Sequence, residues 1–440
     1  MTAVLPNEDE GNKPLSRNRN YSILWTSQLL SELTIEIVAV AVPLLIMARS
    51  GSALEVGLAA SVMAAVHMIS VVPAGVLADR GDRRKIMLVC QAARVAGLAS
   101  LVAALVMDAY FFPHVLLVVA LEGFLGSVFD PVEHATLPTV VPESQLMTAV
   151  ARNTARPYVA AMLGPFSAGL LFTLHPAAPF VTQAVMLALS FGALVFLRLP
   201  RLAVLPGGPD SGEPGEPEAL ETSEPEGLEG PRTRGARADT VEGVRWVMGH
   251  GVIRMTLVWI MLTNLVFSAL VIVVLVRSGE ENVPSHEIGL MMTCFGIGGL
   301  LGAAVAARLT GALRPSVLVV GFSLVVTAVT GGMAYVPGGL PLGLLFGLAA
   351  FLAPAANTTV LTYQMLAAPE GMRGRLSGIS GLSSGIAGVV GPALGSVVVA
   401  LTEGPLTFLV CAGGFALVAL ITVLSPSLRR FPSLDTVHSS

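Results

Sequence analysis

The chain has 440 residues, of which 54% are hydrophobic and 12% are charged, and its mean hydropathy is +0.77. Soluble domains carry about 25% charged residues, so this composition excludes an ordinary soluble protein and indicates an integral membrane protein. The formal net charge of −4 hides a division, because eight acids stand between positions 210 and 229 without a base among them. The rest of the chain is therefore basic, as a membrane protein's inner face requires. Nothing in this balance indicates nucleic-acid binding.

Three cysteines, Cys90, Cys294 and Cys411, all lie within apolar runs. An odd number without paired spacing argues against disulfides and against a metal site, and we expect no cofactor. The first twenty residues are polar, so we expect no signal peptide. Arginine far outnumbers lysine, and alanine and glycine are abundant. This usage is typical of a GC-rich bacterial genome.

A membrane-spanning helix needs about 20 apolar residues, and the sequence offers about twelve such stretches separated by Gly, Pro or charged breaks. The runs are continuous rather than alternating, which favours helices over a β-barrel. The spans that we predict are 22–48, 54–78, 84–107, 114–137, 149–173, 178–199, 252–277, 286–309, 315–336, 341–366, 376–402 and 405–425.

The predicted organisation is a cytoplasmic tail (1–20), a six-helix bundle (21–199), a linker (200–245), a second six-helix bundle (246–425) and a second cytoplasmic tail (426–440). The linker is rich in Pro, Gly and Glu, and it cannot bury enough apolar surface to fold, so we expect it to be disordered and cytoplasmic. With both termini inside, the loop arginines fall on the cytoplasmic side, and only Arg49 and Arg277 fall outside.

The two predicted bundles repeat one another. Glu55-Val-Gly-Leu answers Glu287-Ile-Gly-Leu, and Gly164-Pro165 answers Gly391-Pro392, at a spacing near 225 residues. A repeat of six spans is typical of transporters with parallel halves, which bind substrate near the bilayer midplane between the halves. The predicted fold class is therefore an all-α membrane protein with twelve transmembrane helices in two pseudo-symmetric bundles.

The loop between the second and third spans carries the most specific pattern in the chain. It reads Gly75-Val-Leu-Ala-Asp79-Arg80-Gly-Asp-Arg83-Arg84-Lys. This resembles the signature loop of the major facilitator superfamily, and its Asp-Arg-x-Asp-Arg-Arg form is similar to the macrolide-efflux and siderophore-exporter branch. The resemblance implies that Asp79 faces the positive N-terminal end of the eleventh span, beside a loop with Arg373 and Arg375.

Ionisable residues inside a bilayer are costly, and most of those in this chain lie in the first half. Glu32 and Glu36 share one face of the first span, without an obvious basic partner. Desolvation and mutual repulsion favour proton uptake, so both are candidates for proton coupling or for attracting a cationic substrate. The alternative is that Glu36 lies at a helical edge and reaches water. Related exporters usually carry an acid at the place of Ile35, so in this chain the acid has moved or its role is lost.

Further charged residues of the first half suggest two pairs. Arg94 and Glu122 fall near mid-membrane on adjacent spans, as a stabilising ion pair or a coupling element. Asp130 and Arg156 fall at similar depth and suggest a cytoplasmic gate pair, to which Arg373 and Arg375 would belong. Arg152 and Glu133 are expected at the interface. His67 near mid-span either titrates near neutral pH or only packs.

Gly164-Pro165-x-x-x-Gly169 resembles the antiporter signature of drug exporters, with Ala168 where a second Gly is usual. Small residues permit close helix approach and proline bends a span, so we expect a helix bend here and at Gly391-Pro392. The second half offers only polar insertions, which we expect in the cavity: Asn264, Asn357 and Gln364.

The residues and the resemblance together predict a secondary transporter, and the resemblance implies that it is not an enzyme. Since no phosphate-binding loop is present, we expect an ion gradient rather than ATP to drive transport. We expect proton-coupled efflux of an amphipathic small molecule, such as an antibiotic, drug or siderophore, by a monomer in the bacterial inner membrane. The expected partners are this substrate, protons and the lipid bilayer. Alternatives are an importer or lysolipid transporter on the same fold, or a membrane sensor that binds a ligand without moving it.

Overall fold

The computed structural model describes residues 15–197 and 245–429. The linker predicted at 200–245, apart from its last residue, and most of both predicted tails therefore lie outside the described residues. Within the described ranges the secondary structure is helical and contains no strand.

Six long helices form the N-terminal bundle and seven form the C-terminal bundle, with one short segment at each end of the described chain. In chain order they are η2 (Leu15–Arg17), α1 (Arg19–Arg49), α2 (Ala53–Arg80), α3 (Arg83–Val106), α4 (Phe112–Val140), α5 (Glu143–Leu174), α6 (Ala178–Val195), α8 (Gly251–Glu280), α9 (Ser285–Ala312), α10 (Pro315–Met333), α11 (Leu340–Phe351), α12 (Ala353–Ala367), α13 (Glu370–Leu401), α14 (Leu406–Leu424) and α15 (Pro426–Arg429). The described part contains 12 helical segments long and apolar enough to cross a membrane, with α11 and α12 forming one of them. The predicted all-α fold with twelve spans is confirmed.

Short polar residues define where the first three helices begin. The side chains of Asn18, Ser52 and Asp82 precede α1, α2 and α3, and each accepts a hydrogen bond from a backbone N–H in the first turn. Such caps satisfy donors that have no partner within the helix. The helix starts therefore follow from local chemistry, and the apolar runs fix the helix lengths.

The tenth predicted span, 341–366, crosses as expected but is not one helix. α11 ends at Phe351, and α12 begins at Ala353 with Pro354 in its first turn. Proline lacks the N–H that would continue the hydrogen-bond ladder, and it favours a first-turn position. Pro131 in α4 leaves its helix continuous, so the break belongs to the C-terminal bundle only.

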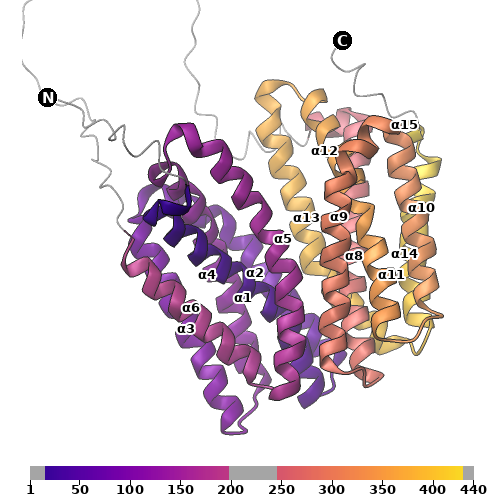
Figure 1. The fold of residues 1–440 in the computed structure, drawn as a ribbon. Helices are drawn as coiled ribbons and strands as arrows, with labels where there is room; N and C mark the ends of the chain where they lie inside the picture. Colours follow the sequence, from indigo (N-terminus) through magenta and orange to yellow (C-terminus); the bar gives the residue numbers. More distant parts are fainter. Residues whose placement is uncertain (1–14, 198–244, 430–440) are drawn as a thin grey trace, which may run out of the picture.

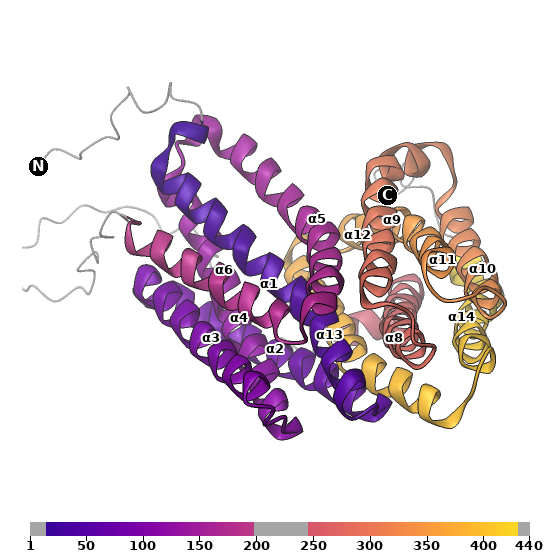
Figure 2. The same cartoon turned by 60° about the horizontal axis from the view of Figure 1, so that its bottom comes forward.

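The two bundles stand side by side and diverge toward one end of the molecule (Figures 1 and 2). We call the end at which α1 begins and α14 ends the terminal side, and the other end, with Arg49 and Arg277, the opposite side. α2 packs against α13, and α5 packs against α9, on two sides of the junction between the bundles.

The bundles approach most closely where glycines replace side chains. A Cβ atom at Gly169 of α5 would meet the backbone of Ser285 and Gly289 on α9, and one at Gly57 of α2 would meet Pro392 and Ser396 on α13. We call these two contacts the closed seam. Both lie toward the opposite side, so that side is closed in this conformation while the terminal side is splayed (Figure 1).

Candidate functional site

The N-terminal bundle is built around a buried arginine. The Arg94 guanidinium on α3 lies 2.8 Å from Glu122 of α4, and both side chains are almost fully buried. Arg94 also donates to the hydroxyls of Ser31 and Thr34 on α1, at 2.6 and 2.9 Å. The expected pairing of Arg94 with Glu122 is therefore present, within a network that joins three helices. A buried charge is tolerated only when it is paired and hydrogen-bonded in this way.

A second buried arginine corrects two predictions. Arg156 of α5 lies 3.0 Å from Glu32 of α1 and 3.5 Å from Glu133 of α4. Glu32 is therefore not without a basic partner. The predicted Asp130–Arg156 gate pair is wrong for this conformation, because Asp130 instead accepts a hydrogen bond from Gln28 at 2.8 Å. Helical spacing gave similar depths but not the facing direction of each side chain.

Glu133 corrects a further prediction, since it is fully buried rather than interfacial. Together, Glu32, Glu133 and Arg156 form what we call the Arg156 cluster, in which two carboxylates share one guanidinium. Arg152, one turn nearer the terminal side, is exposed. Glu36 is half-buried against Gly164 of α5, and the structure gives it no ion pair within the described ranges.

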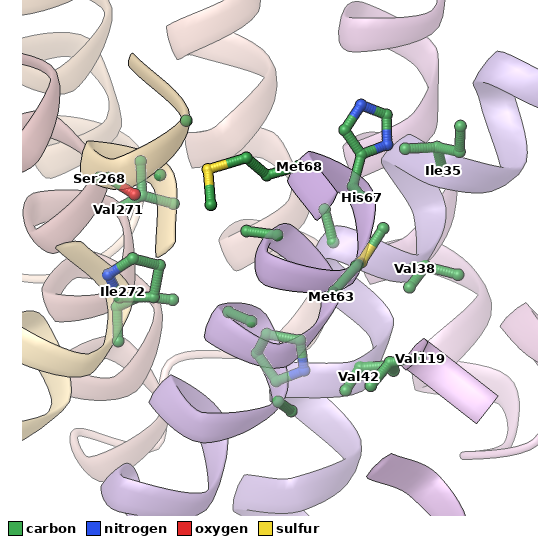
Figure 3. Close-up of a pocket in the computed structure, with 18 of the residues that line it drawn as sticks. Ile35, Val38, Val42, Met63, His67, Met68, Val119, Ser268, Val271 and Ile272 are labelled. Atoms are coloured by element: carbon green, nitrogen blue, oxygen red, sulfur yellow. The ribbon is translucent and has the colours of Figure 1, made fainter. Parts of the chain in front are cut away.

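A cavity of about 890 Å³ lies at the junction of the two bundles. Its wall comes mainly from α1, α2, α8 and α13, and Figure 3 shows Ile35, Val38 and Met63 of the N-terminal bundle across from Val271 and Ile272. Apart from His67 and Ser268, the side chains on this wall are apolar or absent, as at the glycines of α13. Such a site matches the apolar surface of a small molecule and offers few hydrogen bonds.

This lining departs from the expected one. Of Glu32, Glu36, His67, Arg94 and Glu122, only His67 reaches the wall (Figure 3). The expected cavity residues of the second half are also elsewhere. Asn264 donates to Ser384 at 3.5 Å, Gln364 to Thr256 at 3.0 Å, and Asn357 is exposed outside the wall.

A smaller pocket of about 320 Å³ adjoins the Arg156 cluster. It is formed by α1, α4 and α5 and is lined by Glu32, His134, Leu137, Val150, Asn153, Thr154, Arg156, Pro157 and Tyr158. We call it the polar pocket. Glu32 in the polar pocket and Ile35 in the large cavity stand one helical turn apart on α1, so the two spaces follow one another along that helix.

The signature loop clamps the N-terminal bundle at its terminal side. Arg83 donates to the Ala135 carbonyl of α4 at 2.7 Å, and Arg84 donates to carbonyls at Leu194 and Val195 of α6. Leu194 and Val195 lie in the last turn of α6, where a cation is favourable, whereas Ala135 lies inside α4. These two arginines thus tie the start of α3 to α4 and to α6.

Asp79 of the same loop is exposed, and no contact of its side chain with α13 is found in the part of the chain that the structure describes. The contact that the resemblance implies is therefore not made here, as the two bundles are apart at this side. Gly75 has open space where a Cβ would stand. The Arg80 side chain lies outside what the structure describes.

The predicted gate arginines of the second bundle are not gathered with Asp130 and Arg156. Arg373 donates to the carbonyls of Met365 and Ala368 within its own bundle, at 3.1 and 3.2 Å. Arg375 donates to the Met372 sulfur. Like the signature loop, Arg373 binds a helix end, here that of α12.

The two Gly-Pro motifs occupy matching places in the bundles. Gly164 packs on Glu36 of α1, and Gly391 packs on Ser268 and Leu265 of α8. Pro165 and Pro392 lie inside α5 and α13, and their carbonyls face Gly289 and Gly57 across the bundle junction. The motifs thus lie at the closed seam, where a Cβ would not fit.

Asn153 and the Arg156 cluster were not found from the sequence. Arg156, Asn153 and Glu133 all stand in α4 or α5, where the helical pattern alone leaves several pairings open. A stricter use of the three- and four-residue repeat would have placed Asn153 on the same face as Arg156.

Comparisons with known proteins agree with this architecture. The family model of the Major Facilitator Superfamily matches residues 24–281 and 257–436. The Enterobactin exporter EntS of Citrobacter koseri is 24% identical over 421 residues, covering 93% of each chain. Two solved structures share the fold. The nucleoside transporter NupG has a TM-score of 0.65 at 11% identity, covering 96% of this chain and 99% of that chain.

The other is a bacterial homolog of the human lysosomal transporter Spinster, in an inward-facing and unoccupied conformation. It has a TM-score of 0.63 at 14% identity, covering 96% of this chain and 98% of that chain. The match of the family model over most of the chain, with two bundles of six spans each around a junctional cavity, shows that the chain belongs to the Major Facilitator Superfamily of membrane transporters.

Proposed function

We propose that this transporter exports an amphipathic small molecule, such as an antibiotic, drug or siderophore, from a bacterial cell in exchange for protons. The observation that carries the proposal is the cavity of about 890 Å³, which both bundles line with apolar side chains. A site of this kind binds apolar surface and is poorly suited to a small, fully polar solute. The name of the similar Enterobactin exporters supports the outward direction.

The charge distribution supports cytoplasmic termini. Arg83, Arg84, Arg314 and Arg373 stand at the terminal side. At the opposite side, Arg49 pairs with Asp108, and Arg277 pairs with Glu280. An excess of cations marks the cytoplasmic face. The splayed terminal side then opens to the cytoplasm, and the conformation is inward-facing in the inner membrane. We propose that a single chain suffices, because both halves of the cavity come from it.

The Arg156 cluster is the site that we propose for proton coupling. Its two carboxylates and one guanidinium carry a net negative charge when Glu32 and Glu133 are both ionised. When Glu32 is protonated, Arg156 and Glu133 remain as a neutral ion pair, so the cluster then carries no net charge. Alternating water access to Glu32 would then load and release the proton. We assign Arg94–Glu122 to structure, because Arg94 also donates to hydroxyls of α1 and so joins three helices.

The test uses purified protein in proteoliposomes with the cationic dye rhodamine 6G as the transported probe. A pH gradient should drive uphill movement of the dye by the wild type. Glu32→Gln keeps the shape and hydrogen bonding of the side chain but cannot titrate. At a saturating dye concentration, which offsets any loss of affinity for the cationic dye, it should retain counterflow without a gradient and lose uphill transport. Glu36→Gln should have a smaller effect.

The matched control is Asn264→Asp, which stands at the same place in α8 as Glu32 in α1, thirteen residues after the first residue of each helix. Adding an acid there should not restore coupling to Glu32→Gln. If Glu32→Gln and Glu36→Gln, singly and together, still drive the dye uphill, the coupling site is elsewhere, and His67 on the cavity wall is next to be tested.

A further inference from the structure

The polar pocket is lined by a buried amide side chain for which the described residues offer no hydrogen-bond partner. Asn153 is 7% exposed, and within the described part of the chain neither its amide nitrogen nor its amide oxygen has a hydrogen-bond partner. Leaving such a group buried and unpaired costs about 1–3 kcal/mol for each donor or acceptor. A buried amide that lines an open pocket is therefore placed to bind something that enters it.

The charged side chains around the Asn153 amide determine whether the pocket favours a cationic or an anionic ligand group. Glu32, which lines the pocket, and the buried Glu133 share the single guanidinium of Arg156. Asp130 stands nearby with its carboxylate held by Gln28, and exposed Arg152 lies one turn away. The buried groups thus have a carboxylate in excess, and the pocket favours a cation over an anion.

We propose that the polar pocket binds the polar end of the substrate, and that this end is a protonated amine beside a hydrogen-bond acceptor such as a hydroxyl. The amine donates to Glu32 and to the Asn153 amide oxygen, and the neighbouring acceptor receives the Asn153 amide N–H. This inference rests on the proposed function, because it names the class of molecule that the transporter carries.

The apolar part of the same molecule lies in the large cavity. Glu32 and Ile35, one turn apart on α1, line the polar pocket and the cavity respectively. Three residues along α1 correspond to a rise of about 4.5 Å, and a molecule whose amine lies about five bonds from its aromatic or aliphatic body is long enough to span that distance. The exposed side chains of Thr154 and His134 at the pocket leave a route in from the splayed side.

A matched series of probes tests the proposal by binding alone. All three share a naphthyloxy-propanol body and differ in the terminal group, which is an isopropylamine (propranolol), a hydroxyl or a carboxylate. Naphthyl fluorescence reports binding to the detergent-purified full chain. The wild type should bind the amine at least tenfold tighter than the diol, with the acid weakest.

Three variants locate the effect. Asn153→Leu keeps the branched shape and the number of heavy atoms of the side chain. It should weaken amine binding about tenfold, while its melting temperature is unchanged or higher because two unpaired buried atoms are removed. Glu32→Gln should bring the affinity for the amine close to that for the diol. Met63→Ala, on the apolar wall, should weaken all three probes alike.

Asn357→Leu is the control, since Asn357 is exposed and lines neither space. It should bind all probes as the wild type does. Equal binding of the three probes by the wild type overturns the proposal. So does an Asn153→Leu variant that melts earlier and binds the amine normally, because Asn153 would then be structural. If Asn153→Leu does not fold, the amine-to-diol ratio of Glu32→Gln decides alone.

The binding test of the ligand class and the transport test of the proposed function can fail independently of each other. Amine preference without proton-driven transport in proteoliposomes would remove the transport mechanism and leave the ligand class. Proton-driven transport with no preference among the three probes would leave the mechanism and remove the ligand class.

Discussion

The two bundles follow the same plan with different interiors. α1 and α8 correspond in register, and Glu32 in one answers Asn264 in the other. In the N-terminal bundle Glu32 meets Arg156, whereas Asn264 donates a hydrogen bond to Ser384. Arg94 of α3 answers Val326 of α10, since each stands eleven residues after the first residue of its helix.

Where the first bundle has ion pairs, the second has aromatic rings. Phe267 of α8 packs with its ring centroid 5.0 Å from that of Phe415 on α14, and Phe295 lies 4.5 Å from Phe346. Aromatic pairs hold helices together without any charged group. The difference teaches that helix placement in this fold is set by glycines and prolines at the seam. The bundle interiors were thus free to diverge, and the titratable chemistry of the described chain gathers in one of them.

The largest expected effect comes from breaking the charged interior. Arg94→Leu leaves Glu122 buried without its partner, so we expect a loss of about 3–5 kcal/mol of stability and poor folding. Arg94→Leu with Glu122→Leu makes this site resemble the second bundle and should recover most of the loss. Fluorescence-detected size exclusion and thermal melts measure both. Val326→Leu is the control, and normal melting of Arg94→Leu alone would contradict the assignment.

Substitutions in the closed seam test whether its two contacts contribute equally to the conformation. Gly169→Ala and Gly57→Ala each place a methyl against backbone of the other bundle, so the opposite side should open and the terminal side should close. Overpacking of this kind costs about 1–3 kcal/mol, and both variants should shift the population similarly. Spin labels at the exposed positions Met147 and Leu313 report the terminal-side distance.

Gly321→Ala serves as the control for this pair, because a Cβ there meets nothing within 4 Å. If only one of the two seam variants shifts the labels, the two sides of the junction are not equivalent. If neither does, the closed seam is not the contact that sets the conformation.

A smaller effect is expected at the signature loop, which the second bundle lacks. Asp79→Asn should leave the conformation described here intact, since Asp79 is exposed and no contact with the described side chains of α13 is found in it. It should weaken the other conformation, in which the family resemblance places Asp79 at α13, and so favour the conformation described here several-fold. The same spin labels measure this shift. A collapse of probe affinity would instead make Asp79 part of the binding site.

The smallest effect concerns helix starts. Asp82 caps α3, while Arg314 at the start of α10 makes no such hydrogen bond. Asp82→Ala should cost at most about 1 kcal/mol in the thermal melt, and less because the carboxylate is half exposed, whereas Arg314→Ala should cost nothing measurable.

The pH dependence of this cap has a defined sign. The backbone N–H of Lys85, aided by its ammonium, holds the pKa of the Asp82 carboxyl below its usual range. The stabilisation is therefore fully present above the ordinary pKa of an aspartate and is lost as the pH falls through the lowered value. The melting difference between wild type and Asp82→Ala should shrink only in acid. A difference that grows in acid would contradict the cap.

The spans, the repeat and the Arg94–Glu122 pair were predictable from the sequence, because length, hydropathy and depth along a helix are one-dimensional quantities. The partner of Arg156 was not predictable in this way. Asp130, Glu133 and Glu32 lie at similar depths, and only the rotation of α4 and α5 about their axes decides between them. The prediction of the residues that line the cavity was wrong for the same reason. Asn264 and Gln364 of the second bundle bind side chains of neighbouring helices instead.

The position of the closed seam has a mechanical consequence. Gly169 stands five residues from the end of α5, so about 40 Å of that helix extends beyond the contact toward the terminal side, at 1.5 Å per residue. If one bundle rotates about this contact, the displacement grows in proportion to the lever arm. A rotation of about ten degrees would move the far helix ends by roughly 7 Å and the mid-helix cavity wall by about half as much. The mouth at the terminal side therefore opens about twice as far as the cavity walls that contact the bound molecule.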